Sequence, residues 1–159
     1  MNIYVTSGTG EAPTKLAAFD QALLAAGVAD HNLVTLSSMI PPGAELVQAS
    51  MPQTGDTWGQ LLYVVLADRR EAIVGAEAWA GIGWVQEEGN GRGMFVEHEG
   101  GSLHTVEAQI EASLTTMMHS RRVRFGPIRL VTAGITCGEH PVCALVVAAF
   151  GGAQDWPTS

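Results

Sequence analysis

Two adjacent serines, Ser37 and Ser38, could carry out a reaction on the backbone of their own chain. A serine hydroxyl next to a strained peptide carbonyl can attack that carbonyl and move the acyl group from nitrogen to oxygen. Elimination from the resulting ester leaves dehydroalanine, which hydrolyses to a pyruvoyl ketone on the new N-terminus. Attack by Ser38 on the carbonyl of Ser37 would divide the chain into residues 1–37 and 38–159. Because a Ser-Ser pair also arises by chance, its surroundings must supply the specificity.

The residues on either side of the serine pair predict that the scissile bond lies at the end of a strand. Leu33–Leu36 is an apolar run typical of a strand, and Asn32 stands at its start. Pro41-Pro42-Gly43 must stop any strand that follows, because consecutive prolines cannot continue a hydrogen-bonded ladder.

The N-terminal region predicts a strand over residues 3–6, a glycine-rich turn over 7–10 and a helix that begins near Pro13 and ends at Gly27. The turn lacks the third glycine and the Gly-Lys-Ser/Thr sequence of phosphate-binding loops. Asp20 is expected at the edge of the core-facing side of this helix. That side is formed by apolar residues three or four positions apart, namely Leu16, Phe19, Leu23 and Leu24.

The rest of the chain predicts mostly strands. A second helix is expected over 103–119, where apolar residues recur every three or four positions. Strands are expected at 44–47, 61–67, 73–85 with a break at Gly81-Ile82-Gly83, 93–97, 128–135 and 143–150. Residues 48–59 are rich in turns, and the tail after Gly151 is expected to be frayed or held by Trp156 alone. Single helices between groups of strands favour an α+β fold in one domain over a doubly wound sheet.

The composition narrows the classes of partner. The 159 residues carry a net charge of −8, which argues against nucleic acid and anionic membranes as partners and suits a cationic substrate. Cys137 and Cys143 have a spacing that matches no common metal or redox motif, so no metal site is expected. The sequence has neither a signal peptide nor an apolar run of 18 residues, so a cytoplasmic location is the default expectation.

Several short motifs, taken in order, resemble those of the pyruvoyl-dependent arginine decarboxylase family. They are Gly8-x-Gly10, Leu16-Ala17-Ala18-Phe19-Asp20-x-Ala22-Leu23, Asn32-Leu33, Ser37-Ser38, Pro41-Pro42-Gly43 and, more loosely, Phe95-Val96-Glu97-His98-Glu99-Gly100. The resemblance is densest over residues 6–47. It implies a four-layer α-β-β-α sandwich, self-cleaved protomers assembled as a homotrimer or a dimer of trimers, and active sites at subunit interfaces.

The resemblance also implies roles for individual residues. It places self-cleavage between Ser37 and Ser38, with Ser38 becoming the covalent pyruvoyl cofactor and Asn32 assisting the cut. Asp20 matches the acidic residue that faces the substrate guanidinium, which a carboxylate can bind bidentately. Glu97 matches the proton donor, although Glu99 lies close enough to take its place in the motif. The implied reaction is the conversion of L-arginine to agmatine and carbon dioxide, in polyamine synthesis or acid resistance.

The chemistry is coherent without the family. Removing carbon dioxide from an amino acid leaves a carbanion that needs an electron sink, and a ketone that condenses with the substrate amine provides one. A carboxylic acid must then return a proton to the α-carbon, and burial would keep Glu97 protonated for this purpose.

Two alternatives remain open at this stage. One is a pyruvoyl decarboxylase for another amino acid, such as ornithine, lysine or aspartate. The other is an uncleaved, noncatalytic trimer that binds a small cation, such as agmatine, or a protein partner.

Overall fold

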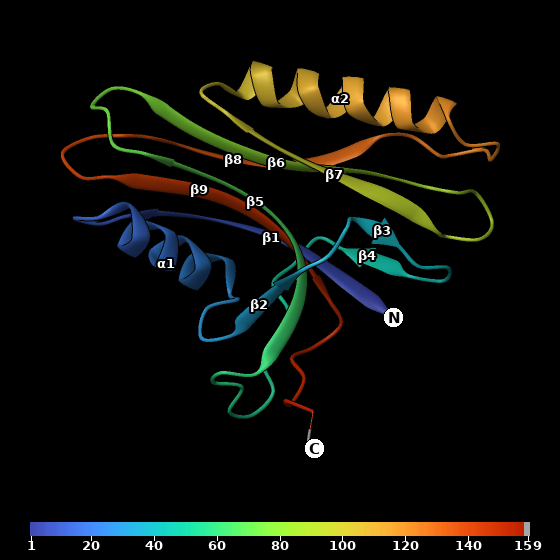
Figure 1. The fold of residues 1–159 in the computed structure, drawn as a ribbon, viewed down its shortest axis with the longest axis horizontal. Helices are drawn as coiled ribbons and strands as arrows, with labels where there is room; N and C mark the ends of the chain where they lie inside the picture. Colours follow the sequence, from blue (N-terminus) through green and yellow to red (C-terminus); the bar gives the residue numbers. More distant parts are fainter. Residues whose placement is uncertain (158–159) are drawn as a thin grey trace.

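Two β-sheets packed face to face form the centre of the molecule, and one helix covers the outer face of each sheet (Figure 1). The computed structural model describes residues 1–157. The elements in chain order are β1 (Asn2–Glu11), α1 (Lys15–Ala26), β2 (Asn32–Thr35), β3 (Met39–Ile40), β4 (Glu45–Val47), β5 (Leu61–Glu71), β6 (Glu77–Gln86), β7 (Gly93–Gly100), α2 (Leu103–His119), β8 (Arg129–Thr136) and β9 (Val142–Phe150). The expected four-layer α-β-β-α sandwich is confirmed.

The sheets have five and four strands, in the orders β2-β5-β9-β1-β4 and β3-β7-β6-β8. Most neighbours are antiparallel, but β1 pairs with β4 and β2 with β5 in parallel. All nine residues of β9 are buried, because this strand has the other sheet on one face and α1 on the other. β2 belongs to the first sheet and β3 to the second, so residues 36–38 carry the chain from one sheet to the other.

Hydrophobic clusters fill the three interfaces between the four layers. Between the sheets, Phe95 contacts Trp84 and Phe150 edge to face, with ring centroids 6.3 and 6.0 Å apart. A second cluster joins α1 to its sheet, and a third joins α2 to the other. The expected helix at 103–119 is confirmed at both ends, and α1 ends before Gly27, whose φ of 75° is the left-handed conformation typical of a helix C-cap.

The predicted turn at residues 7–10 is wrong, because β1 continues through it to Glu11. Gly8 and Gly10 let α1 lie directly on this strand. A Cβ at Gly8 would be 2.2 Å from the carbonyl oxygen of Ala22, and a Cβ at Gly10 would be 2.2 Å from that of Ala18.

The predicted apolar face of α1 is only partly correct, because Phe19 and Leu23 are partly buried against the core but do not form the centre of the contact with the sheet. The residues buried against the sheet are Ala18, Ala22 and Ala26, since only small side chains fit so close a contact. Leu16 and Leu24 are 69% and 51% exposed.

The predicted break at Gly81-Ile82-Gly83 is also wrong. These residues lie inside the continuous strand β6, and residues 73–76, expected in that strand, belong to the turn before it. A Cβ at Gly83 would be 2.2 Å from Cγ2 of Ile110 on α2. Both helices therefore pack on paired glycines of a strand.

Candidate active site

Ser38 lies at the point where the chain passes between the two sheets. The backbone of Leu36 still donates to the Val64 carbonyl of β5, at 2.9 Å, and the Ser38 carbonyl already accepts from the Phe95 N–H of β7, at 2.8 Å. Ser37 is the single residue between these two anchored points. Ser38 has a φ of 65°, a left-handed conformation that costs a non-glycine residue about 1–3 kcal/mol. The expected cleavage bond is thus held at both sides and precedes a strained residue.

The Ser38 hydroxyl donates to the Glu97 carboxylate, with Oγ 2.7 Å from Oε1 and 3.0 Å from Oε2. Glu97 lies within β7, two residues after Phe95, and residues two apart along a strand share one face. The packing of Phe95 against Phe150 of β9 identifies this face as the one directed at the other sheet. The structure therefore brings together two predicted residues that are 59 positions apart.

Glu99 shares this face but is engaged elsewhere. Its carboxylate accepts from the Arg69 guanidinium of β5 at 2.8 Å, and this hydrogen bond raises the pKa of Arg69. His98 lies on the opposite face, where its ring is 2.8 Å from the Ser113 hydroxyl of α2. Of the three consecutive side chains from 97 to 99, Glu97 is the one that contacts Ser38.

A pocket of about 440 Å³ lies beside Glu97 at this edge of the sandwich. Its lining includes three carboxylates, those of Asp68, Glu97 and Glu99. The Asp68 carboxylate pairs with Arg70 at 3.1 Å and the Glu99 carboxylate with Arg69, so Glu97 is the acid of this group without a basic partner in the described residues. A cationic ligand would provide that partner.

Glu97 is exposed in the single chain. The burial that was expected to keep it protonated is therefore not provided by residues 1–157 of one chain.

Asn32 lies at the other end of β2. The strand separates Asn32 from Thr35 by roughly 10 Å, with Leu36 and Ser37 still to follow before Ser38. The Asn32 carboxamide donates to the Gly59 carbonyl at 2.8 Å. It is not brought to Ser38 within one chain.

Asp20 is also apart from Ser38. It lies on the exposed side of α1, and its carboxylate has no hydrogen bond or ion pair among residues 1–157. The neighbouring Phe19 is covered by Arg70, whose guanidinium carbon is 4.0 Å from the ring centroid. Of the predicted site residues, Ser38 and Glu97 are thus in contact, whereas Asn32 and Asp20 form no hydrogen bond with either of them within residues 1–157.

The sequence argument missed the residues around Asn32. The Gly59 carbonyl accepts from Asn32 and also from the Trp156 indole, at 3.0 Å. Gln154 exchanges two backbone hydrogen bonds of 2.8 Å with Leu61. The tail is therefore not held by Trp156 alone as expected, although residues 158–159 lie outside the described residues. Contacts so distant in sequence leave no local spacing that could have revealed them.

Within residues 1–157, no group of three or more His, Cys, Asp and Glu side chains could hold a metal ion. Both cysteines are buried and free, and burial raises the pKa of the Cys143 thiol to about 12. In the same residues, neither helix has the length and apolar character needed to cross a membrane.

Comparison with known proteins identifies the family. Residues 2–154 match the family described as pyruvoyl-dependent arginine decarboxylase. Curated proteins of that name are similar to this chain along most of its length. The one from Methanopyrus kandleri is 36% identical over 146 residues, covering 91% of each chain. The one from Halobacterium salinarum is 33% identical over 153 residues, covering 94% of this chain and 93% of the relative.

A third relative of the same name, from Methanothermobacter thermautotrophicus, is 38% identical over 76 residues, which is 48% of this chain and 50% of that protein. The extent of these matches leads to one conclusion: the chain belongs to the pyruvoyl-dependent arginine decarboxylase family.

Proposed function

We propose that this chain cuts itself between Ser37 and Ser38, and that the pyruvoyl group derived from Ser38 serves to convert L-arginine to agmatine and carbon dioxide. The observation that supports the proposal most directly is the hydrogen bond from the Ser38 hydroxyl to Glu97, next to a residue with a φ of 65°. Family membership gives the cofactor and the substrate class. The pyruvoyl carbonyl supplies the electron sink for loss of carbon dioxide.

The residues at the site fit the formation of this group. Glu97 is placed to accept the Ser38 hydroxyl proton as Oγ attacks the Ser37 carbonyl carbon. The Ser37–Ser38 amide bond breaks as the ester bond forms, and the freed Ser38 amine takes up the proton that left Oγ. A base then removes the Ser38 Cα proton while the Cβ–Oγ bond breaks, and Oγ leaves as part of the Ser37 carboxylate. Water completes the change by releasing ammonia. No outside oxidant or reductant is required.

After the cut, Glu97 lies next to the position of the new ketone and can hold the proton that must reach the substrate α-carbon. Asp20 is the proposed partner of the substrate guanidinium, because a carboxylate offers it two parallel hydrogen bonds. Both steps favour a site shielded from water.

We propose that a second copy of the chain completes the site, as part of a trimer. Asp20 and Asn32 do not meet Ser38 within one chain, and large hydrophobic side chains near Asn32 are exposed, with Trp58 at 77% and Trp156 at 61%. Docking the surface around Asn32, Trp58 and Trp156 of one copy against the Ser38–Glu97 edge of a neighbour would bury the two tryptophans and the Ser38–Glu97 pair. It would also bring the Asn32 carboxamide to the cleavage bond, where an N–H donor can stabilise the oxyanion of the shift.

Intact-mass measurement tests the self-cleavage. Cutting 159 residues after Ser37 should give chains of 37 and 122 residues, the longer one with a ketone in place of the serine amine. Incubation of the cleaved protein with arginine should release carbon dioxide and agmatine. A single full-length mass after prolonged incubation would contradict the cleavage, and cleavage with turnover of lysine but not arginine would contradict only the substrate.

A further inference from the structure

A second, larger pocket begins at Met39, the residue that follows Ser38. Its volume is about 660 Å³, and neither Ser38 nor Glu97 nor Asp20 lines it. Its apolar surface comes from three segments: Met39 and Ile40 of β3, Met94 of β7, and Val123 and Phe125 in the connection from α2 to β8. The size lies within the range of pockets that enclose small organic ligands.

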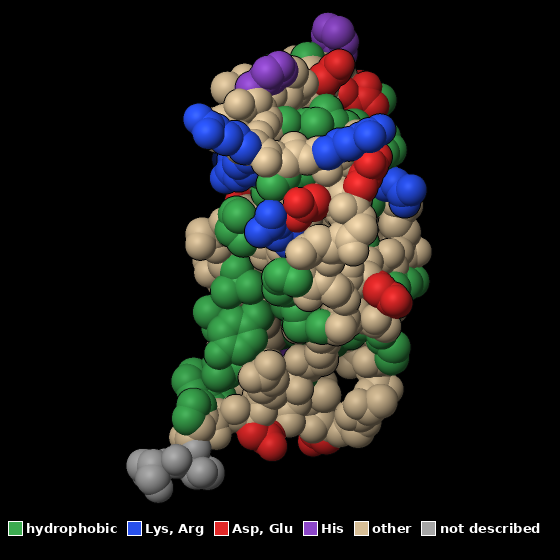
Figure 2. Space-filling model, turned by 90° about the vertical axis from the view of Figure 1, so that its right-hand side faces the viewer, with side chains coloured by type: hydrophobic (Ala, Val, Ile, Leu, Met, Phe, Trp, Pro, Cys, Tyr) green, Lys and Arg blue, Asp and Glu red, His purple; other side chains and the backbone are tan. Residues whose placement is uncertain are grey.

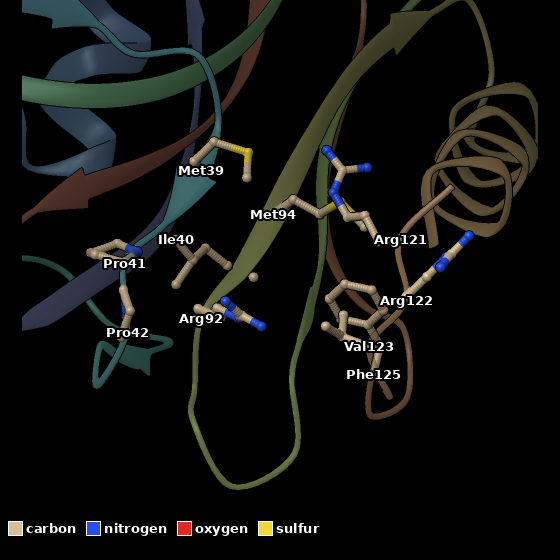
Figure 3. Close-up of a pocket in the computed structure, with 11 residues that line it drawn as sticks. Met39, Ile40, Pro41, Pro42, Arg92, Met94, Arg121, Arg122, Val123 and Phe125 are labelled. Atoms are coloured by element: carbon tan, nitrogen blue, oxygen red, sulfur yellow. The ribbon is translucent and has the colours of Figure 1, made fainter. Parts of the chain in front are cut away.

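Basic side chains gather at this pocket in an otherwise acidic protein. Figure 2 shows Lys and Arg side chains collected around hydrophobic surface on this side of the molecule. The chain has eight Lys and Arg residues and a net charge of −8, and Arg92, Arg121 and Arg122 all line the pocket. In Figure 3 the Arg92 guanidinium extends from the residue before β7 toward Val123 and Phe125, and Arg121 lies beside Met94.

These arginines are not all neutralised by the protein. Arg92 is paired with the Glu87 carboxylate. Arg121 instead donates to the Met117 carbonyl at 2.9 Å and to the Ser120 hydroxyl. Among residues 1–157, no carboxylate forms an ion pair with Arg121 or Arg122. Two adjacent positive charges beside an apolar wall would be stabilised by a ligand that brings a negative charge.

We propose that this pocket binds a small amphipathic anion, with a carboxylate or an acid of similar shape at Arg121 and Arg122 and an apolar body against Met39, Met94 and Phe125. Arginine binds such planar anions bidentately. Methionine side chains adapt to apolar bodies of different shapes. The site is distinct from the Ser38–Glu97 pair and binds ligands of the opposite charge to the proposed substrate.

The test is a binding titration on the protein with all 159 residues present, in the cleavage state and assembly that it adopts in solution. Anilinonaphthalene sulfonate, which is apolar with one negative charge, should bind saturably with one site per chain and gain fluorescence. Decanoate should displace it, and decyltrimethylammonium, of similar length but positive charge, should not.

Variants locate the binding. Arg122→Gln should weaken probe binding by about tenfold, because it removes a charge-assisted partner of the anion. The Arg122 side chain forms no hydrogen bond within residues 1–157 whose loss could unfold the segment. Val123→Glu, which places a carboxylate at the pocket, should abolish binding. Arg124→Gln is the matched control, since Arg124 is 85% exposed, pairs with Glu88 and does not line the pocket.

Three results would overturn the proposal. The first is equal probe affinity in Arg122→Gln and Arg124→Gln. The second is equal displacement by the anionic and cationic competitors. The third is the absence of saturable binding in the assembled protein, which would mean that a second copy of the chain covers this pocket.

Discussion

The backbone and the side chain of Ser38 are held by two different residues of the same strand. β7 holds both groups, with the Phe95 N–H bound to the Ser38 carbonyl and Glu97 bound to its hydroxyl. The φ angle of 65° is the rotation about the N–Cα bond of Ser38, and the Ser37 carbonyl carbon is one of the four atoms that define it. Once the bond between Ser37 and Ser38 is cut, this angle no longer exists, so cleavage would release the local strain of about 1–3 kcal/mol.

Ser38→Ala and Ser38→Gly separate chemistry from strain. Both should remain a single chain of 159 residues, because neither has an attacking hydroxyl. Ser38→Gly should have the higher free energy of unfolding, by about 1 kcal/mol, since glycine adopts a positive φ without a Cβ clash. Mass spectrometry and urea unfolding measure the two effects. Cleavage in Ser38→Ala would place the nucleophile elsewhere, and equal stability would show that Ser38 is not strained.

Glu97→Gln keeps the size of the side chain but removes the proton-transfer group. We expect slower self-cleavage and, in protein that has been cleaved, a turnover lower by about a hundredfold or more with a much smaller change in KM. Glu99→Gln is the matched control, because it makes the same change on the same strand face at a carboxylate already bound by Arg69. A larger loss in Glu99→Gln than in Glu97→Gln would assign the proton transfer to Glu99.

Asp20→Asn preserves shape and removes a charged partner of the substrate. If the guanidinium is buried against Asp20 in the complex, breaking the pair costs about 3–5 kcal/mol, so kcat/KM for arginine should fall by at least about a hundredfold. Self-cleavage should be unchanged, because Asp20 takes no part in the proposed acyl shift. The check is the ratio of arginine to lysine turnover; an unchanged ratio would leave Asp20 as an ordinary surface carboxylate.

At the level of elements, the helices and strands were largely predictable, and the buried face was predictable for α2 but only in part for α1. The regular spacing of Val106, Ile110 and Leu114 predicted α2 correctly, because these residues are indeed its buried face. In α1 the large apolar residues were only a partial guide, since Phe19 and Leu23 are partly buried while the closest contact with β1 is made by alanines. Glycines within β1 and β6 suggested turns, whereas their actual role is to make room for the helix above.

Gly10→Ala tests this close packing. The new Cβ would meet the Ala18 carbonyl, a backbone atom that cannot move aside, so the free energy of unfolding should fall by about 2 kcal/mol or more. Gly138→Ala should change stability by less than about 0.5 kcal/mol, because no atom lies within 4 Å of its added Cβ. Urea denaturation compares the two. Equal effects would mean that α1 can move away from the strand at little cost.

The site was predictable only in part. Short motifs pointed to Ser38 and Glu97, and the fold brings them into contact. Ser38 and Glu97 are 59 residues apart in the sequence, so their contact depends on how the fold brings distant segments together. The Arg69–Glu99 pair, which distinguishes the two glutamates, depends on the packing of one sheet on the other. No local sequence pattern encodes either contact.

At the scale of the whole molecule, the separation of Asp20 from Glu97 has a direct genetic test. When the two inactive variants Asp20→Asn and Glu97→Gln are co-expressed, mixed trimers should contain sites that combine a native Asp20 from one copy with a native Glu97 from another. Random mixing should restore activity to about a quarter of the sites. A chain that carries both Asp20→Asn and Glu97→Gln, expressed alone, should stay inactive. Absence of recovery in the mixed protein would show that each site belongs to one chain.

The position of β1 gives the proposed cut a further consequence. β1 lies inside the five-stranded sheet between β9 and β4, and β2 lies on its edge, so both strands of the 1–37 segment are bound to strands of the 38–159 segment. Before the cut, refolding is unimolecular and independent of dilution. Afterwards two separate chains must find each other, and the short one buries its strands only in a partner that is itself incomplete without them. The mature enzyme would then persist because its pieces separate slowly, and its maturation would be a step that unfolding cannot reverse.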